Sequence, residues 1–200
     1  MNIGILYEGR YDKDPIVSLI KLILEEIHCS APSVFVTSEA GGSILQKMAS
    51  AAVLFFENDV KKCDIALYIS DTDYNDRKKR IISQWINNYC RLNPLGNIIA
   101  GYPEPYLEQW FLNDPDSIRK TFSLPNNAAL PFAETVNPKE RFIEIIESLN
   151  DDKSKARNDL YSEVASNVNL SSLSSVDPSF KAFHRHTKQA LRRLCGAHTH

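Results

Sequence analysis

Three acidic residues in this chain, Glu8, Asp71 and Asp73, have the types and positions needed to hold a metal ion together. Glu8 follows the short apolar run 3–7, and the two aspartates follow the apolar run 64–69. Ligands of open parallel sheets bind beyond the carboxyl ends of the strands. If these two strands are neighbours, the three carboxylates converge and raise one another's pKa unless a cation neutralises them.

A cluster of carboxylate oxygens selects a hard cation such as Mg²⁺ or Mn²⁺. Such an ion can activate water and stabilise the leaving oxygen in phosphoryl transfer. The pattern therefore predicts a catalytic centre with one or two Mg²⁺ or Mn²⁺ ions, built on Glu8, Asp71 and Asp73. In this prediction Glu8 is a metal ligand or a general base.

The Asp-x-Asp pair also occurs in structures of other kinds. After a strand, such a pair is often only a turn or a helix cap. An EF-hand loop that starts at Asp71 requires glycine at its sixth position and glutamate at its twelfth. Those positions hold Asp76 and Ile82, which excludes an EF-hand. A phosphatase that uses aspartate as its nucleophile usually carries it after the first strand, whereas this pair follows the third.

The elements that position these residues alternate between strand and helix. Apolar runs predict strands at 3–7, 34–36, 64–69 and 97–100, and helical spacing predicts helices at 14–27, from 41 to about 55, at 76–92 and from about 103. Such alternation indicates parallel βαβ units with right-handed crossovers. After Asp114 only helices are expected, with the serine-rich segment 171–175 as a polar connector between two of them.

The composition suits one domain, or one domain with an appendage, in a chain of 200 residues. No apolar run approaches the roughly 20 residues of a membrane helix, and no signal peptide is evident at the N-terminus. Four scattered cysteines without a CxxC pair indicate neither a zinc site nor a disulfide framework, so a reducing cytoplasm is expected. Trp85 and Trp110 are expected in the core, and a metal site at His184 and His186 or at His198 and His200 is not expected.

Basic residues are concentrated in two places. The segment 178–200 has no acidic residue and five basic ones: Lys181, Arg185, Lys188, Arg192 and Arg193. A basic end on an acidic body favours a polyanion or an acidic partner, with a solvated helix face as the alternative. The predicted helix after the Asp pair begins with Arg77, Lys78, Lys79 and Arg80, which could hold the phosphates of a nucleic acid.

The order of Glu8-Gly9 after the first strand and Asp71-x-Asp73 after the third resembles the Toprim domain of topoisomerases, primases and nucleases. The resemblance covers about residues 1–125 and leaves 126–200 as a helical appendage packed on that domain. It implies a Rossmann-like parallel sheet of about four strands flanked by helices.

Two further segments resemble smaller branches of that family. Segment 8–12, Glu-Gly-Arg-Tyr-Asp, is similar to the overcoming-lysogenization-defect nucleases, in which a second acid, commonly glutamate, helps to hold a second metal. Segment 103–114 resembles small stand-alone Toprim-like proteins with a helix of the form Glu-x-Trp-Leu-x-x-Asp. Genes for such proteins often lie beside an ATPase of the ABC or structural-maintenance type, in mobile-element or antiphage defence systems. Asp12 and Glu108 are therefore candidates for a second metal position, and Lys139 is a candidate phosphate contact.

Together these patterns predict a Mg²⁺-dependent nuclease that hydrolyses a phosphodiester of DNA or RNA. Nucleotidyl transfer of the primase type is one alternative, since the same metal core serves both reactions. A non-enzymatic regulatory or binding subunit of an ATPase complex is another. The sequence contains no GxxxxGK[ST] motif, so any ATPase would be a separate partner.

Overall fold

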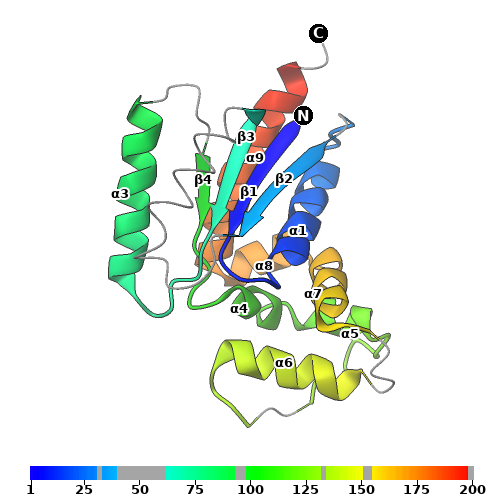
Figure 1. Cartoon of the computed structure of the whole chain (residues 1–200). Helices are drawn as coiled ribbons and strands as arrows, with labels where there is room; N and C mark the ends of the chain where they lie inside the picture. The colour runs from blue at the N-terminus through cyan, green and yellow to red at the C-terminus, as the bar shows by residue number, and fades with distance from the viewer. Residues whose placement is uncertain (31–32, 40–61, 93–97, 132–133, 151–154, 198–200) are drawn as a thin grey trace.

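The structure is a computed structural model that describes residues 1–30, 33–39, 62–92, 98–131, 134–150 and 155–197. Its centre is a four-stranded sheet in the order β2-β1-β3-β4, in which every pair is parallel (Figure 1). The strands are β1 (Asn2–Tyr7), β2 (Val34–Glu39), β3 (Ile65–Ile69) and β4 (Ile98–Gly101). The predicted α/β class and parallel sheet are confirmed, and β1 and β3 are neighbours.

Helices flank this sheet and also make up the C-terminal region. They are α1 (Lys13–Glu26), α3 (Asp76–Leu92), α4 (Leu107–Leu112), α5 (Pro115–Thr121), α6 (Pro138–Leu149), α7 (Arg157–Ser166), α8 (Leu170–Val176) and α9 (Pro178–Ala197). The expected helix from residue 41 to about 55 lies outside the described residues. None of the described helices is long and apolar enough to span a membrane.

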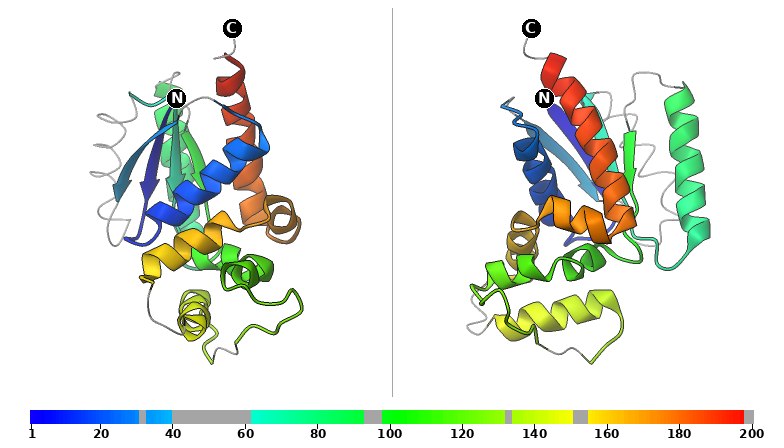
Figure 2. Two further views of the ribbon diagram at one scale, coloured as in Figure 1. Left: turned by 90° about the vertical axis from the view of Figure 1, so that its right-hand side faces the viewer. Right: turned by 180° about the vertical axis from the view of Figure 1, so that it is seen from behind.

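Both faces of the sheet are covered. Ile3 and Ile5 of β1 and Leu67 of β3 are buried in the main core with α1 and α9, whereas Leu6 and Tyr68 face a second cluster under α3. Successive side chains of a strand point to opposite faces, so a strand covered on both sides must be apolar throughout. Figure 2 shows α9 running along one face of the sheet, with α3 on the other side.

The last helix is part of the main core. A Cβ atom at Gly101 would lie 2.9 Å from Cδ2 of Phe183, so glycine allows α9 to approach β4 closely. The fully buried Trp110 ring stacks on Phe183 with the centroids 5.4 Å apart, which confirms its predicted core position. Trp85 is partly buried against the second cluster and stacks on Tyr89. The proposed domain boundary near residue 125 stays a prediction.

Two helix predictions were wrong in detail. Helix α4 begins at Leu107, later than expected, because a residue before proline avoids the helical region and the segment 103–106 carries two prolines. The predicted connector 171–175 lies inside α8. The side chain of Asn169 caps this helix by accepting a hydrogen bond from the Ser172 N–H at 3.0 Å, and Leu173 is fully buried. Cap and burial together outweigh the modest helix propensity of serine.

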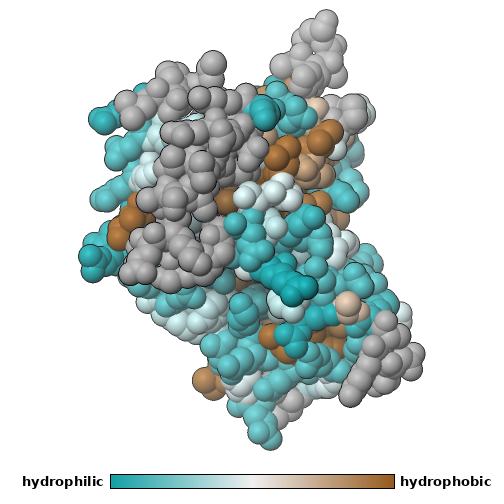
Figure 3. Space-filling view, in the orientation of Figure 1, coloured by the Kyte–Doolittle hydropathy of each residue, from teal (hydrophilic) through white to brown (hydrophobic). Residues whose placement is uncertain are grey.

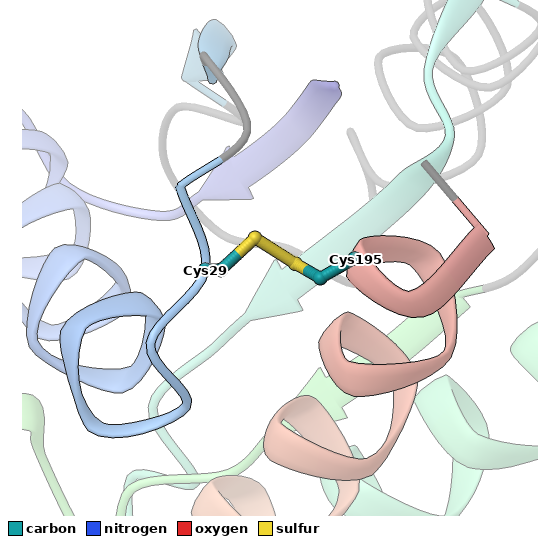
Figure 4. Close-up of a disulfide and its surroundings, with 2 residues drawn as sticks. All are labelled: Cys29 and Cys195. Carbon is teal, nitrogen blue, oxygen red and sulfur yellow. A yellow bond between two sulfur atoms is a disulfide. The ribbon is translucent and has the colours of Figure 1, made fainter. Parts of the chain in front are cut away.

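A disulfide joins Cys29, just after α1, to Cys195 near the end of α9 (Figure 4). The expectation of no disulfide was wrong, because a separation of 166 residues in sequence hides a Cα–Cα distance of 5.8 Å. A second link joins the same two helices. The Glu26 carboxylate contacts His184 Nε2 at 2.7 Å and accepts a hydrogen bond from Lys188 Nζ at 2.5 Å. These two bonds outweigh the effect of burial and lower the pKa of Glu26.

The surface seen in Figure 3 is mostly hydrophilic over the described residues, with hydrophobic residues gathered toward the upper right. That side of the molecule carries β2, whose first residue, Val34, is 58% exposed. Strand β2 pairs only with β1 among the described strands, so it is an edge strand there.

The disulfide gives a stability prediction. Cys195→Ser is expected to lower the free energy of unfolding of the oxidised protein by about 3 kcal/mol, because the crosslink restricts the unfolded chain. Chemical denaturation measures the difference. A reducing agent should destabilise the unsubstituted protein by a similar amount and leave Cys195→Ser unchanged. Equal unfolding midpoints for the two oxidised proteins would show that the crosslink contributes nothing.

Candidate functional site

The predicted acidic residues gather at the carboxyl ends of β1 and β3. The chain leaves β1 through Glu8 and Gly9 and then turns, so that the Gly9 N–H donates to Oδ2 of Asp12 at 2.7 Å. A Cβ atom at Gly9 would lie 3.0 Å from that same oxygen. The absence of a side chain at Gly9 therefore leaves room for the Asp12 carboxylate, which is only 8% exposed.

The loop after β3 is fixed by the loop that precedes α4. Oδ1 of Asp71 accepts a hydrogen bond from the backbone N–H of Leu107 at 2.9 Å. The Thr72 N–H donates to the carbonyl oxygens of Pro103 and Pro105, at 3.1 and 3.0 Å. The proline-containing segment noted in the sequence thus holds Asp71 in place at the end of the sheet.

Glu108 in the first turn of α4 is 2% exposed. Its Oε1 accepts a hydrogen bond from the hydroxyl of Tyr161 in α7, at 3.0 Å. Its Oε2 is buried and has no hydrogen-bond partner in the described part of the chain. A buried carboxylate oxygen without a partner is costly, so this atom is suited to bind a cation. Burial, and secondly the Glu108 charge, raise the pKa of Tyr161 above its usual range.

Electrostatic interactions connect three acids, Asp12, Asp71 and Glu108, which we call the inner carboxylates. Burial raises the pKa of Asp71 to about 8, and the nearby charges of Asp12, Glu108 and Glu8 add to the effect. Burial likewise raises the pKa of Asp12 to about 7, with a further contribution from Glu108. Lys139 of α6 faces the same group. Burial would lower the pKa of its ammonium, but the carboxylates, Glu108 first among them, raise it.

Glu8 and Asp73 form an outer pair around the ammonium of Lys78. The Lys78 Nζ atom donates to both Glu8 carboxylate oxygens, at 3.0 and 3.1 Å, and to Oδ2 of Asp73 at 2.5 Å. The nearest oxygens of the two acids therefore lie within about 5.5 Å of each other, the sum of the two shorter contacts. Ser70 also donates to Glu8, at 3.0 Å. The backbone at Asp73 is left-handed, with φ of 51°.

The side chains of this site are of the types that bind a metal ion, but their positions in the structure do not surround one. Among the described residues, no three acidic, histidine or cysteine side chains converge closely enough to surround one ion as they stand. The donors nevertheless suit a hard cation: the carboxyls of Asp12 and Asp71 have raised pKa values, and Glu108 Oε2 has no hydrogen-bond partner among the described residues. A metal bound here would require side-chain rotation, above all by Glu8 and Asp73, which point toward Lys78.

The predicted phosphate contacts on α3 and α9 lie in different parts of the molecule. Arg77 and Arg80 are exposed at the start of α3, on the side of the candidate site, whereas Lys79 pairs with Glu104. Lys188 pairs with Glu26 on α1, and the exposed Arg192 and Arg193 lie near the end of α9. Figure 1 shows that end of α9 beside the beginning of the sheet. The structure therefore does not bring Arg192 and Arg193 to the acidic site.

Two side chains at the site were missed in the sequence. Ser70 directly follows β3 and could have been found by its position, but Tyr161 lies 53 residues from Glu108, in a helix with no distinctive motif. His184 is a structural residue that bonds Ser174 and Glu26. His198 and His200 lie outside the described residues.

Comparison with protein-family models, curated proteins and solved structures finds no match to this chain.

The raised pKa values give a prediction for the metal-free protein. The carboxyls of Asp12 and Asp71 titrate near 3.8 when unperturbed, so between about pH 4 and pH 8 the folded state binds more protons than the unfolded state. The free energy of unfolding should therefore fall as pH rises through that range. Asp71→Asn should weaken this dependence and be at least as stable as the unsubstituted protein at pH 7, since an amide oxygen can still accept from Leu107.

Denaturant unfolding in EDTA at several pH values measures both effects. A pH-independent stability, or a clear loss of stability in Asp71→Asn at pH 7, would contradict this account of the cluster.

Proposed function

We propose that this protein is a Toprim-type, Mg²⁺- or Mn²⁺-dependent phosphodiesterase that cleaves DNA or RNA. The observation that carries the proposal is the group of inner carboxylates. In it a buried Glu108 oxygen has no hydrogen-bond partner within the described part of the chain, and Asp12 and Asp71 have raised pKa values. The close grouping of like charges at the ends of two adjacent strands is costly for a fold and useful for binding a divalent cation.

In this mechanism Asp71, Asp12 and Glu108 would be the inner ligands, with Glu8 and Asp73 joining them after rotation. A bound ion would lower the pKa of a water molecule and neutralise negative charge on the phosphoryl group. Glu8, whose side chain is 20% exposed, would accept a proton from the attacking water. Lys139, which faces the carboxylates from α6, would hold a phosphate oxygen.

Partner side chains keep these groups in position. Tyr161 orients Glu108, the Leu107 N–H orients Asp71, and Ser70 orients Glu8. Such outer contacts fix the direction in which a carboxylate presents its free oxygen. The exposed Arg77 and Arg80 lie where a nucleic-acid backbone would enter.

The proposed setting is antiphage or mobile-element defence, with an ATPase of the ABC or structural-maintenance type as partner. It rests on the resemblance of segments 8–12 and 103–114. Primase-type nucleotidyl transfer would use the same carboxylates. A non-enzymatic binding subunit of the ATPase complex is favoured by a different observation, namely that no three described carboxylates converge on one point.

Substitution of single ligands tests the enzymatic proposal. Asp71→Asn and Glu108→Gln should each lower metal-dependent cleavage of DNA or RNA by at least about 100-fold, the upper end of the loss seen on removing a ligand's outer partner. Both amides keep the existing hydrogen-bond acceptor, so folding should persist. Asp116→Asn is the matched control, because Asp116 is 75% exposed and pairs with Arg119 away from the cluster.

The assay measures cleavage with and without the ATPase partner. Full activity in Asp71→Asn would refute the mechanism, whereas a complete lack of cleavage by the unsubstituted protein in every mixture would favour the binding subunit.

The basic end of α9 gives a separate prediction on affinity. If Arg192 and Arg193 contact phosphates, changing both to glutamine should reduce the slope of log affinity against log salt by about 2, one for each phosphate that the variant no longer neutralises. Lys21→Gln, on the exposed face of α1, shows the effect of losing one positive charge elsewhere on the surface. Fluorescence anisotropy with a labelled oligonucleotide over a salt series measures the slope. An unchanged slope would assign these arginines to a solvated helix face.

A further inference from the structure

Lys78 is an unusual lysine, because it is only 5% exposed in the first turn of a helix that otherwise begins with solvent-facing charges. Lysine is almost never buried without a partner. Here the ammonium makes three short contacts with two acids, Glu8 and Asp73. A buried ammonium paired with two carboxylates in this way is satisfied as a cation.

We propose that Lys78 is a tethered counter-ion. Its ammonium occupies the cation position between Glu8 and Asp73, and a divalent metal ion must displace it before these two carboxylates can act as ligands. The inference rests on the proposed function and adds a means of regulation to the same site. Lys78 then sets the metal affinity of the protein and prevents Glu8 and Asp73 from binding an ion while it is in place.

The contacts of Glu8 support this competition. Both of its carboxylate oxygens accept from Lys78, and Oε2 also accepts from Ser70. While the Glu8 oxygens accept from Lys78, they are not directed at an ion bound by Asp12, Asp71 and Glu108. The same contacts direct Glu8 and Asp73 toward the ammonium, although Glu8 is close enough to Asp71 to contribute to the raised pKa of that carboxyl.

The surroundings of Lys78 also distinguish it from a phosphate contact. Its neighbours Arg77 and Arg80 are exposed, and Lys79 is partly exposed, whereas the Lys78 side chain is 6% exposed. A phosphate in solvent therefore cannot reach this ammonium until the ion pairs open.

Lys139 provides a matched control for charge. It acts electrostatically on Glu108, Asp71, Asp12 and Glu8, the last of which also contacts Lys78, but no hydrogen bond or ion pair joins its ammonium to any of them in the described chain. Lys78→Met and Lys139→Met therefore each remove one positive charge from the surroundings of Glu8. Only Lys78→Met also frees Glu8 and Asp73.

The first experiment measures binding of Mn²⁺ alone by titration calorimetry, without nucleic acid. The apparent metal affinity is reduced when only a fraction of the protein has Glu8 and Asp73 free to bind an ion. Removal of the Lys78 ammonium should therefore raise the affinity. Lys78→Met is expected to bind Mn²⁺ at least about 10-fold more tightly than Lys139→Met, which itself gains only from the lost charge. Equal affinity of the two variants would overturn the inference.

The second experiment uses the unsubstituted protein and so does not depend on the folding of a variant. The rate at which an amine-acetylating reagent modifies Lys78 is measured by mass spectrometry, with and without saturating Mn²⁺. Displacement predicts that Mn²⁺ increases the modification of Lys78 at least about 10-fold, because the ammonium leaves its buried contacts. Modification of Lys79, which pairs with Glu104 outside the cluster, should not change. A Lys78 rate that is unchanged by Mn²⁺ would also overturn the inference.

Asp71→Asn separates the two proposals. If the unsubstituted protein binds Mn²⁺ and Asp71→Asn does not, the metal site stands, and the comparison of Lys78→Met with Lys139→Met decides the inference alone. If Mn²⁺ binds equally to the unsubstituted protein and Asp71→Asn, the proposed function fails. If no variant binds Mn²⁺, both proposals fail.

Discussion

The fold has to keep five carboxylates together at one end of a parallel sheet, and the rest of the structure depends on how it does so. They belong to Glu8, Asp12, Asp71, Asp73 and Glu108. Like charges in a buried position oppose one another, and each must be balanced by a proton, a hydrogen bond or a positive charge. The fold uses all three. Asp12 and Asp71 have raised pKa values, Glu108 accepts from Tyr161, and Lys78 lies between Glu8 and Asp73.

This constraint gives the C-terminal region a role beyond covering the sheet. Glu108 comes from α4, Lys139 from α6 and Tyr161 from α7, so three helices after β4 complete a site that β1 and β3 begin. The same helices share the main core with the sheet, in which Phe111, Phe142 and Tyr161 pack ring against ring. The position of each charged group therefore depends on the packing of apolar neighbours in the same helix.

The links between α1 and α9 hold the opposite end of the molecule together. The disulfide of Cys29 with Cys195 and the Glu26 contacts with His184 and Lys188 join the first helix to the last. Lys188, a predicted phosphate contact, and His184 both contact Glu26 there. Positive charge that remains exposed on α9 belongs to residues such as Arg192 and Arg193, far from the acidic site.

The sequence by itself determined the strands, the α1 and α3 helices, and the placing of Glu8 and Asp71 at strand ends, because these follow from local apolar patterns. Tertiary structure alone decided which partner each acid has. Lys78 bonds Glu8 although the two are 70 residues apart in the sequence, and Tyr161 bonds Glu108 although they are 53 residues apart. It also decided that Cys29 and Cys195 bond and that segment 171–175 is helical. Such pairings depend on how distant segments pack, and short-range periodicity carries no information about that.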